Sequence, residues 1–327
     1  MEQTRYSRRS AGAMMAAGLL AATPLRAADA FPDKPIRLIV PFAAGGSADA
    51  VTRIVSAELA KRIGQPVAVE NKGGAGGNLG MAVAARSPAD GYTLVLMADT
   101  VTVNPFLYKN ISFDISKDFT PVGLMAEYHV VLVVNSKSPL KTTADFIAAA
   151  KVNPGGLSFG SSGAGGSSHR VMEQFMSLTG TKLLHVPYQG GGPALTALLG
   201  GQIDAMFDVL GTSKPYLESG QLRAIGVARA TRTPYLPSVP ALSEVVQGME
   251  HSGWYALGAP AGVPAARLER LSKALAEAMA SPAVTQILVG QGYDIATDTS
   301  SRALERLIKK ELAFYGKLMP SIGLEPI

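Results

Sequence analysis

The chain has 327 residues and contains no cysteine, which excludes disulfides, thiol catalysis and thiolate metal or iron–sulfur sites. Its 30 basic and 25 acidic residues give a formal net charge of +5. This excess is mild and is not clustered, so neither nucleic acid nor a membrane surface is an expected partner. A chain of this length folds into about two domains.

The first 30 residues have the layout of a cleaved secretory signal peptide. Three arginines lie among the first nine residues, and the apolar run Ala11–Thr23 is shorter than the about 20 residues that span a bilayer. Ala28-Asp29-Ala30 is a small-x-small cleavage signal. We therefore predict that residues 1–30 are removed on export to the periplasm. The pair Arg8-Arg9 leaves both the Sec and the twin-arginine route open.

From residue 36 onward, short apolar runs alternate with amphipathic stretches. In chain order, the apolar runs predict strands at 36–40, 66–70, 93–98, 129–135, 157–159, 183–187, 205–208 and 223–228. The amphipathic stretches predict helices at 47–63, 78–86, 142–153, 167–178 and 193–199, with Thr142 or Thr143 as the cap of the third. This alternation favours an α/β fold of doubly wound, mostly parallel sheets with helices on both faces.

The C-terminal part has a different pattern. A proline-rich stretch at 234–240 precedes one possible strand at 254–259 and two amphipathic helices at 264–280 and 301–319. Two helices and one strand cannot build a sheet domain of their own, so we expect them to pack on the first one. The expected organisation is therefore a discontinuous lobe 1 formed by 31–129 and 240–327, with lobe 2 formed by 130–239.

Three glycine-rich turns are the candidate functional features. They are Pro41–Asp49, Gly160–His169 and Tyr188–Pro193, and each lies between a predicted strand and a predicted helix. The first backbone N–H groups of a helix are unpaired and lie at the positive end of its dipole, so each turn is a potential anion site. In open α/β sheets, ligands bind beyond the carboxyl ends of the strands. We therefore expect the three turns to close on one anionic ligand from two lobes.

The candidate ligand-binding residues follow from these turns. They are Phe42, Ala44, Gly45, Gly46, Ser47, Asp49, Ser161, Ser162, Gly165, Ser167, His169, Tyr188 and Gly190. Two of them have an alternative role. Asp49 either caps its helix or selects ligands that carry a hydrogen-bond donor, and His169 either contacts the ligand or packs on its helix. Trp254 is expected in the core.

Motifs of catalysis and of cofactor binding are not found. The chain has no G-x-S-x-G elbow, no phosphate loop and no H-E-x-x-H pattern. The cluster Gly73–Asn78 approaches a dinucleotide fingerprint, but Leu79 stands where the third glycine belongs. We expect it to be another helix start at the edge of the cleft. No metal and no cofactor are therefore predicted, and the protein is not expected to be an enzyme.

Several motifs together resemble the Bug family, the substrate-binding proteins of tripartite tricarboxylate transporters. They are Pro41-Phe42 with Gly45-Gly46 and Asp49, Glu70-Asn71 with Gly76-Gly77-Asn78, Asp90–Thr93, Tyr188-x-Gly190 with Pro193-Ala194, Leu198–Asp204, and Trp254-Tyr255 with Ala259–Gly262. The resemblance runs from about Phe31 to Pro326. Ala44 stands where the family often has proline, and Gln189 stands where family members differ.

The resemblance implies a two-lobed periplasmic-binding-protein fold of the Venus-flytrap, type II-like form. It also implies that N–H groups and hydroxyls of the turns hold a carboxylate, which the receptor delivers to integral membrane permease subunits. We expect the receptor to be a monomer. An exported α/β enzyme, a transferase or hydrolase acting on an acidic substrate, is the alternative, because fold alone does not decide function. The ligand stays open among di- and tricarboxylates, acidic amino acids and aromatic acids.

Overall fold

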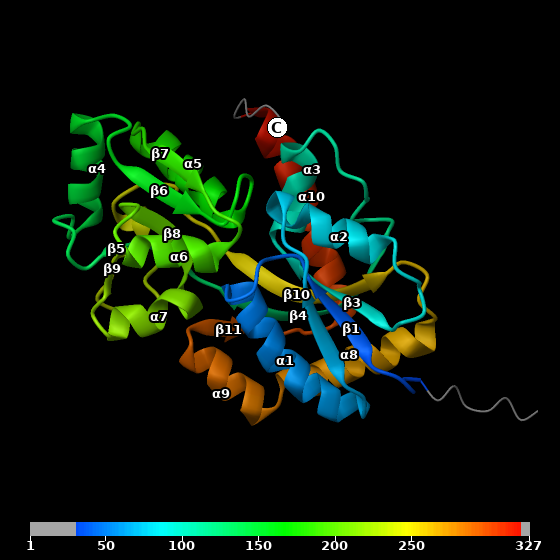
Figure 1. Cartoon of the computed structure of the whole chain (residues 1–327). Helices are drawn as coiled ribbons and strands as arrows, with labels where there is room; N and C mark the ends of the chain where they lie inside the picture. The colour runs from blue at the N-terminus through cyan, green and yellow to red at the C-terminus, as the bar shows by residue number, and fades with distance from the viewer. Residues whose placement is uncertain (1–30, 322–327) are drawn as a thin grey trace, which may run out of the picture.

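The computed structural model describes residues 31–321, which form two lobes, each built on one mixed sheet (Figure 1). The predicted signal peptide lies outside the described residues. The sheet of lobe 1 has the strand order β11-β4-β10-β3-β1-β2. Its strands are β1 (Ile36–Val40), β2 (Val67–Asn71), β3 (Thr93–Ala98), β4 (Phe119–Tyr128), β10 (Gly253–Pro260) and β11 (Tyr293–Ile295).

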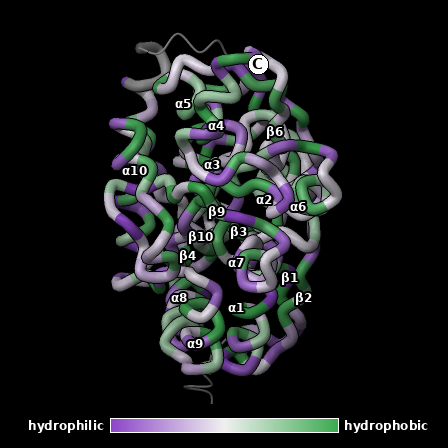
Figure 2. The backbone as a smooth tube through the Cα atoms, turned by 90° about the vertical axis from the view of Figure 1, so that its left-hand side faces the viewer, coloured by the Kyte–Doolittle hydropathy of each residue, from purple (hydrophilic) through white to green (hydrophobic). Residues whose placement is uncertain are grey.

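Helices cover both faces of this sheet, because neighbouring residues of its buried strands face opposite sides. Leu38 joins the apolar cluster that includes residues of α1 (Ser47–Ile63), α8 (Ala265–Met279) and α9 (Pro282–Gly290). Ile39 joins the cluster on the other face with residues of α2 (Asn78–Ala85) and α10 (Ser301–Ser321). The C-terminal helices therefore pack on lobe 1, as expected. Figure 2 shows the mixed hydropathy along α10, a helix with one apolar face.

Lobe 2 likewise has helices on both faces of one sheet. This sheet has five strands in the order β7-β6-β8-β5-β9. Its strands are β5 (Val130–Asn135), β6 (Ser158–Ser161), β7 (Leu184–Pro187), β8 (Ala205–Val209) and β9 (Leu222–Val227). Its helices are α4 (Thr143–Val152), α5 (Ser167–Thr179), α6 (Gly191–Leu199) and α7 (Leu210–Glu218). Phe175 and Phe207 pack between the sheet and α5, while Leu198 and Met206 belong to the cluster on the α6 face.

The sheets are mixed, so the prediction of mostly parallel sheets is corrected. β1 is parallel to β2 and β3, but β10 is antiparallel to both β3 and β4. In lobe 2, β5 is antiparallel to β8 and β9, while β6 is parallel to β7 and β8. The physical reason is the path of the chain. The chain enters lobe 2 directly from β4 to β5 and returns to lobe 1 after β9. On its return, β10 inserts between β3 and β4 and runs antiparallel to both.

The elements that the sequence analysis did not predict are β4, β11, α9, α7 and α3 (Thr100–Leu107). Proline explains part of this result, since it disfavours a helix interior. Pro105 lies inside α3 and Pro215 inside α7. Among residues 31–321, no helix is long and apolar enough to cross a membrane.

Candidate functional site

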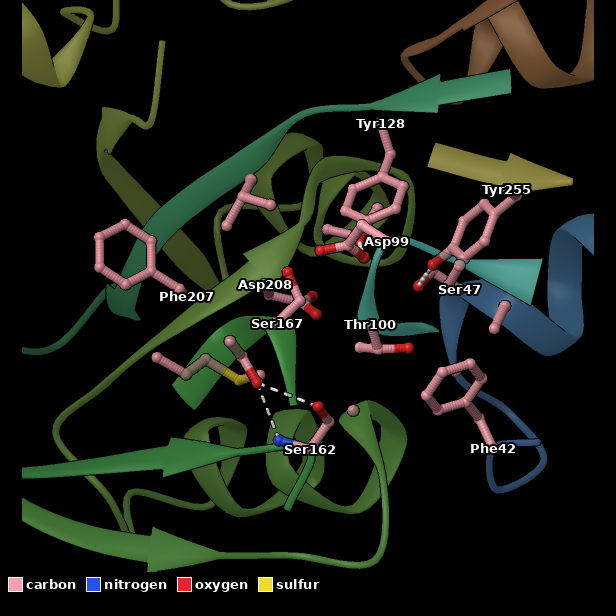
Figure 3. A pocket seen from close by; sticks show the side chains of 18 of the residues that line it. Phe42, Ser47, Asp99, Thr100, Tyr128, Ser162, Ser167, Phe207, Asp208 and Tyr255 are labelled. Carbon is pink, nitrogen blue, oxygen red and sulfur yellow. Dashed lines mark hydrogen bonds between the residues drawn. The ribbon is translucent and has the colours of Figure 1, made fainter. Parts of the chain in front are cut away.

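Two adjacent cavities lie where the lobes meet. The inner cavity has a volume of about 70 Å³, room for roughly five water-sized groups. It is lined by Phe42, Ala43, Gly46, Ser47, Ala48, Ala98, Asp99, Thr100, Tyr128, Val130, Ser162, Ser167, Ser168, Gly191, Met206, Phe207, Asp208, Val209 and Tyr255 (Figure 3). The outer cavity, of about 280 Å³, shares Phe42, Ala43 and Ser162 with it.

Five helices begin at the inner cavity, and none of them has a side-chain N-cap. Their N-cap residues are Gly46 (α1), Asp99 (α3), Gly166 (α5), Gly190 (α6) and Val209 (α7). Elsewhere in the described chain, Thr142 caps α4 and Ser281 caps α9. An uncapped helix start keeps free N–H donors at the positive end of its dipole. The inner cavity therefore combines several helix ends that favour an anion.

The first and third glycine turns approach each other closely across the lobes. A methyl group placed on Gly190 would lie only 2.9 Å from the Cβ of Ala43. A methyl group on Gly46 would lie 3.9 Å from the backbone nitrogen of Gly192. Since Gly190 also has a φ of 137°, a side chain there would be strained as well as crowded. The glycines therefore bring the starts of α1 and α6 to opposite sides of one cavity.

Hydroxyl groups add further polar contacts around the cavity. Ser47 Oγ and Tyr255 OH share a hydrogen bond of 2.6 Å, which joins α1 to β10. Ser162 N–H donates to Ser168 Oγ at 2.9 Å and so orders the second turn (Figure 3). These bonds fix the orientation of the hydroxyls that face the cavity.

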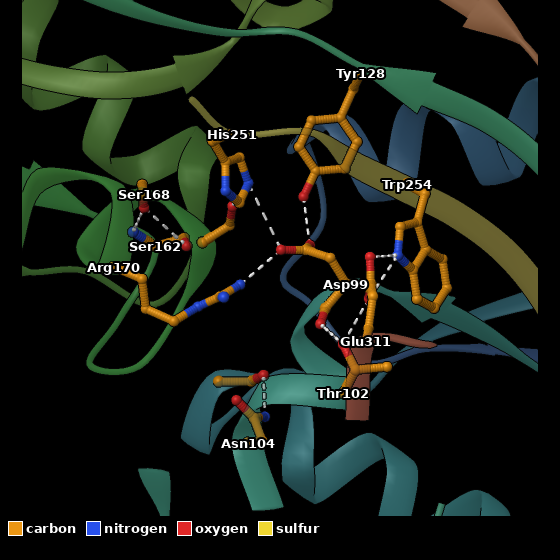
Figure 4. A network of polar contacts seen from close by, with 12 residues as sticks. Asp99, Thr102, Asn104, Tyr128, Ser162, Ser168, Arg170, His251, Trp254 and Glu311 are labelled. Carbon is orange, nitrogen blue, oxygen red and sulfur yellow. Dashed lines mark hydrogen bonds and ion pairs between the residues drawn. The ribbon is translucent and has the colours of Figure 1, made fainter. Parts of the chain in front are cut away.

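An ion pair buried beside the cavity joins the two lobes. Arg170 Nη2 on α5 donates to Asp99 Oδ2 at the start of α3 over 2.6 Å, and Tyr128 OH donates to Asp99 Oδ1 at 2.5 Å (Figure 4). Burial raises the pKa of Asp99, but the Arg170 guanidinium and the Tyr128 hydroxyl outweigh it, so the pKa lies below its ordinary value. Asp99 is therefore an ionised carboxylate whose charge Arg170 balances.

His251 completes this network. Its Nε2 lies 2.9 Å from Ser167 Oγ and 3.6 Å from Asp99 Oδ2. Burial lowers the pKa of His251 to about 4, so the ring is neutral at pH 7. His251 therefore adds hydrogen bonding to the network rather than a second positive charge.

Asp208, at the end of β8, is the second acid of the inner cavity. Thr212 Oγ1 and Ser213 Oγ donate to its Oδ2 at 2.7 and 2.5 Å. A methyl group placed on Gly191 would lie 3.8 Å from its Oδ1, so this oxygen is near the start of α6. Burial raises the pKa of Asp208 to about 6. This carboxylate has neutral hydroxyl partners where Asp99 has a guanidinium.

The structure brings seven of the thirteen predicted residues to the cavities. Those at the inner cavity are Phe42, Gly46, Ser47, Ser162 and Ser167, and those at the outer cavity are Phe42, Ser162, Tyr188 and Gly190. The other six, Ala44, Gly45, Asp49, Ser161, Gly165 and His169, line neither cavity. All three turns thus contribute, but not with every residue.

Asp49, His169 and Ser161 support the turns from behind. Asp49 accepts hydrogen bonds from Gly45 N–H, Asn71 and Arg53, so the structure places it as a support of the first turn. His169 Nδ1 accepts from Gly165 N–H at 3.1 Å, and its ring stacks on His185 at 4.0 Å. Ser161 is fully buried and bonds His185. Of the two alternatives for Asp49 and His169, the structure therefore shows the contacts within the turns, and neither residue lines a cavity.

Ala44, Gly45 and Gly165 also line neither cavity. Gly45 lies against the third turn, since a methyl group on Gly192 would be 3.3 Å from its carbonyl oxygen. A methyl group on Gly165 would lie 2.8 Å from the hydroxyl of Tyr108. These positions serve the close approach of the lobes.

The glycine cluster 73–77 forms part of the outer cavity. It contains the 3-10 turn η1 (Ala75–Gly77) and lines this cavity together with Tyr108, Tyr188 and Gln189. The predicted position of this cluster at the edge of the cleft agrees with the structure. Trp254 is buried in the core of lobe 1, as expected, and its indole N–H also donates to Glu311.

Sequence reasoning missed Asp99, Thr100, Tyr128, Asp208 and Tyr255. Asp99 directly follows β3 and Asp208 is the last residue but one of β8. A helix begins directly after Asp99 and directly after the end of β8, but neither junction has a glycine-rich turn. The strand–helix order alone is the signal that could have found them. Within the described residues, no group of three or more His, Cys, Asp or Glu side chains could hold a metal ion.

Comparison with known proteins identifies the family of this chain. The family model described as the tripartite tricarboxylate transporter family receptor matches residues 51–324. The structure of the periplasmic binding protein BugD superposes with a TM-score of 0.88 at 31% identity, covering 91% of this chain and all of that one. The structure of Rpa4515 of R. palustris with adipate superposes with a TM-score of 0.85 at 32% identity, covering 91% of this chain and 100% of that one.

MatC of Rhodopseudomonas palustris with bound malate gives a TM-score of 0.84 at 31% identity, covering 88% of this chain and 100% of that one. The family match covers most of the chain, and these structures share its two-lobed periplasmic-binding-protein fold. The chain therefore belongs to the receptor family of tripartite tricarboxylate transporters, a family of solute-binding proteins.

Proposed function

We propose that this receptor binds a small carboxylate in the inner cavity and delivers it to membrane permease subunits. The observation that carries the proposal is the meeting of uncapped helix starts from both lobes at one cavity. Backbone N–H groups at such starts bind carboxylates without a basic side chain. Two relatives of the same fold are described with dicarboxylates, adipate and malate.

The first residues of α1, α5 and α6 are the proposed carboxylate contacts. These N–H groups belong to Ser47, Ser167 and Gly191, joined by that of Gly46, the N-cap of α1, and all four residues line the cavity. The Ser47 and Ser167 hydroxyls already bond to Tyr255 and His251, so their orientation is set before the ligand arrives. The site then pays little entropy to order its donors.

The proposed cycle is lobe closure around the ligand, followed by release at the permease. We propose lobe 1 as 31–129 and 240–327 and lobe 2 as 130–239, because the chain passes between the sheets after β4 and after β9. The receptor acts as a monomer in the periplasm, after export by a Sec or twin-arginine signal in residues 1–30. It carries out no chemical step on its ligand.

One group of residues has to be compared with the catalytic triad of a hydrolase, because an exported enzyme is the alternative function. Ser167, His251 and Asp99 lie together in the order of a hydrolase triad. In a working triad the acid bonds Nδ1 and the serine bonds Nε2, whereas here His251 Nε2 is the atom near both partners. Asp99 is also engaged by Arg170. This geometry favours a receptor over a hydrolase.

Ligand release and thermal shift test the proposal together. Mass spectrometry of the small molecules freed from the purified protein should identify an acid. A thermal-shift panel of mono-, di- and tricarboxylates, amino acids and aromatic acids should then contain a stabilising compound, which is recovered unchanged after long incubation. Turnover of the stabilising compound, or stabilisation by none of the acids, would contradict the proposal.

A further inference from the structure

The charge balance of the inner cavity restricts its ligand further. Of the described residues that line it, two are acids, Asp99 and Asp208, and none is Lys, Arg or His. Figure 3 shows both carboxylates pointing into the space between the lobes. A carboxylate ligand therefore enters a cavity that already holds two carboxylates.

The two acids differ in how the protein balances them. Asp99 is ion-paired with Arg170 at 2.6 Å. The side-chain partners of Asp208 are the hydroxyls of Thr212 and Ser213, which carry no charge. Asp208 is 7% exposed, and burying a carboxylate without a cation costs free energy, which a positively charged group bound beside it would offset.

The helix starts separate a negative from a positive side of the cavity. Asp99 stands at the start of α3 and Asp208 just before the start of α7, so these two helix ends already face carboxylates of the protein itself. The starts of α1, α5 and α6 have glycine N-caps, and the one acid in their first turns, Asp49 of α1, bonds Gly45 N–H, Arg53 and Asn71 and lines neither cavity. Three helix ends are thus open to a ligand anion, and Asp208 is open to a ligand cation.

The separation between these two sides is short. Asp208 Oδ1 lies near Gly191, the first residue of α6, as the 3.8 Å from a methyl group built there shows. A ligand that satisfies both must carry its cation and its carboxylate close together. In an α-amino acid both groups are attached to one carbon, and the inner cavity of about 70 Å³ suits such a head group.

We propose that the ligand is an α-amino acid whose carboxylate lies on the starts of α1, α5 and α6 and whose ammonium group lies against Asp208. This inference rests on the proposed function, since it requires a carboxylate in the inner cavity. The side chain of the amino acid extends into the outer cavity through the shared residues Phe42, Ala43 and Ser162. Asp208 is then the residue that separates amino acids from other acids.

Matched acids test this inference by calorimetry on the mature protein. Each set differs only in hydrogen, hydroxyl or ammonium on the α-carbon: propionate, lactate and alanine; succinate, malate and aspartate; 3-phenylpropionate, phenyllactate and phenylalanine. The ammonium member of at least one set should bind at least tenfold more tightly than its two partners. In Asp208→Asn that preference should fall below threefold, because the carboxylate that pairs with the ammonium is gone.

Glu218→Gln is the matched control, since it removes one negative charge from an exposed side chain on α7 of the same lobe. It should keep the full preference. If hydrogen or hydroxyl members bind as tightly as the ammonium members, the inference fails while the proposed function stands. An ammonium preference that persists in folded Asp208→Asn also overturns it. If no acid of any set binds, the proposed function itself is contradicted.

Discussion

Helix starts at the periphery and helix starts at the cavity are built differently. Away from the two inter-lobe cavities, Thr142 and Ser281 accept backbone N–H bonds and close the starts of α4 and α9. At the inner cavity, α1, α5 and α6 begin after glycine and remain open. The uncapped start of α8 after Pro264 lies at neither of the two inter-lobe cavities, so a missing cap alone does not mark a site. A binding site is marked instead by several uncapped helix starts that converge on one cavity.

The largest expected effect comes from the ion pair that holds the starts of α3 and α5 together. Arg170→Met leaves Asp99 buried without its cation, which costs about 3–5 kcal/mol. Because opening the lobes lets water reach Asp99, we expect this cost to destabilise the closed state and not the open one. Ligand affinity, measured by calorimetry, should therefore drop by at least about 100-fold.

The double variant Asp99→Asn with Arg170→Met separates this effect from general damage. It should recover much of the lost affinity, since no unpaired charge remains buried. Equal affinities of Arg170→Met and the unmodified protein would show that the ion pair does not support closure.

Asp208→Asn tests the acidic side of the inner cavity through the free energy of unfolding. The pKa of Asp208 is raised by burial from 3.8 to about 6. The folded state therefore gains stability from the protonated acid below pH 4 and loses it as pH rises through 6. At pH 7 the asparagine variant without ligand should be more stable by up to about 3 kcal/mol. Urea unfolding at pH 7 and pH 4 checks this, with the gain vanishing at pH 4; a gain independent of pH would contradict it.

Gly46→Val should block the open start of α1. Modest space exists for the first carbon, because a methyl group there meets its nearest atoms at 3.8–4.0 Å. The larger side chain projects toward the start of α6, so affinity should fall by about 100-fold, or about 2.8 kcal/mol, with little change in Tm. By contrast, Gly165→Val is a poor test of binding, since φ is 74° and Tyr108 lies 2.8 Å away.

Gly290→Val is the control for added bulk, because a methyl group there meets nothing within 4 Å and the position lies at the end of α9. It should bind the ligand normally. Unchanged affinity in folded Gly46→Val would remove the first turn from the site.

The smallest effects are expected at the capped starts. Thr142→Ala and Ser281→Ala each remove a side-chain acceptor and should cost about 1 kcal/mol of stability. Neither should change ligand affinity, since α4 and α9 do not start at the cavities. Denaturant unfolding and calorimetry on the same samples measure both quantities. A loss of ligand affinity in either variant would contradict the claim that the capped helix starts play no part in binding.

The glycine turns could be found from sequence because their signal is local. The predicted bounds of α1 and β3 match the structure, and the three turns lie at the ends of β1, β6 and β7. Glycine between an apolar strand and a helix marks a position where the backbone approaches another group. No glycine precedes α3 or α7, since Gly211 lies inside α7, and the prolines Pro105 and Pro215 disfavour a helix prediction for both segments.

The acidic side of the cavity depends on contacts between distant residues. Asp99 and Arg170 are 71 positions apart and come from different lobes. Asp49 shows the converse case, because its place in the first turn suggested a ligand contact while Arg53 and Asn71 hold it behind the turn. Local pattern identifies which backbone can bind, and tertiary packing decides which side chains reach the ligand.

The central claim is that open helix starts hold the carboxylate of the ligand. Amide NMR of the ¹⁵N-labelled protein tests it directly, with the tightest-binding acid of the panel and with its methyl ester. The acid should shift the amides of Gly46, Ser47, Ser167 and Gly191, while those of Thr143 and Ala283 at the capped starts stay in place. The ester should not bind. Binding of the acid that leaves the cavity amides unmoved would contradict the account.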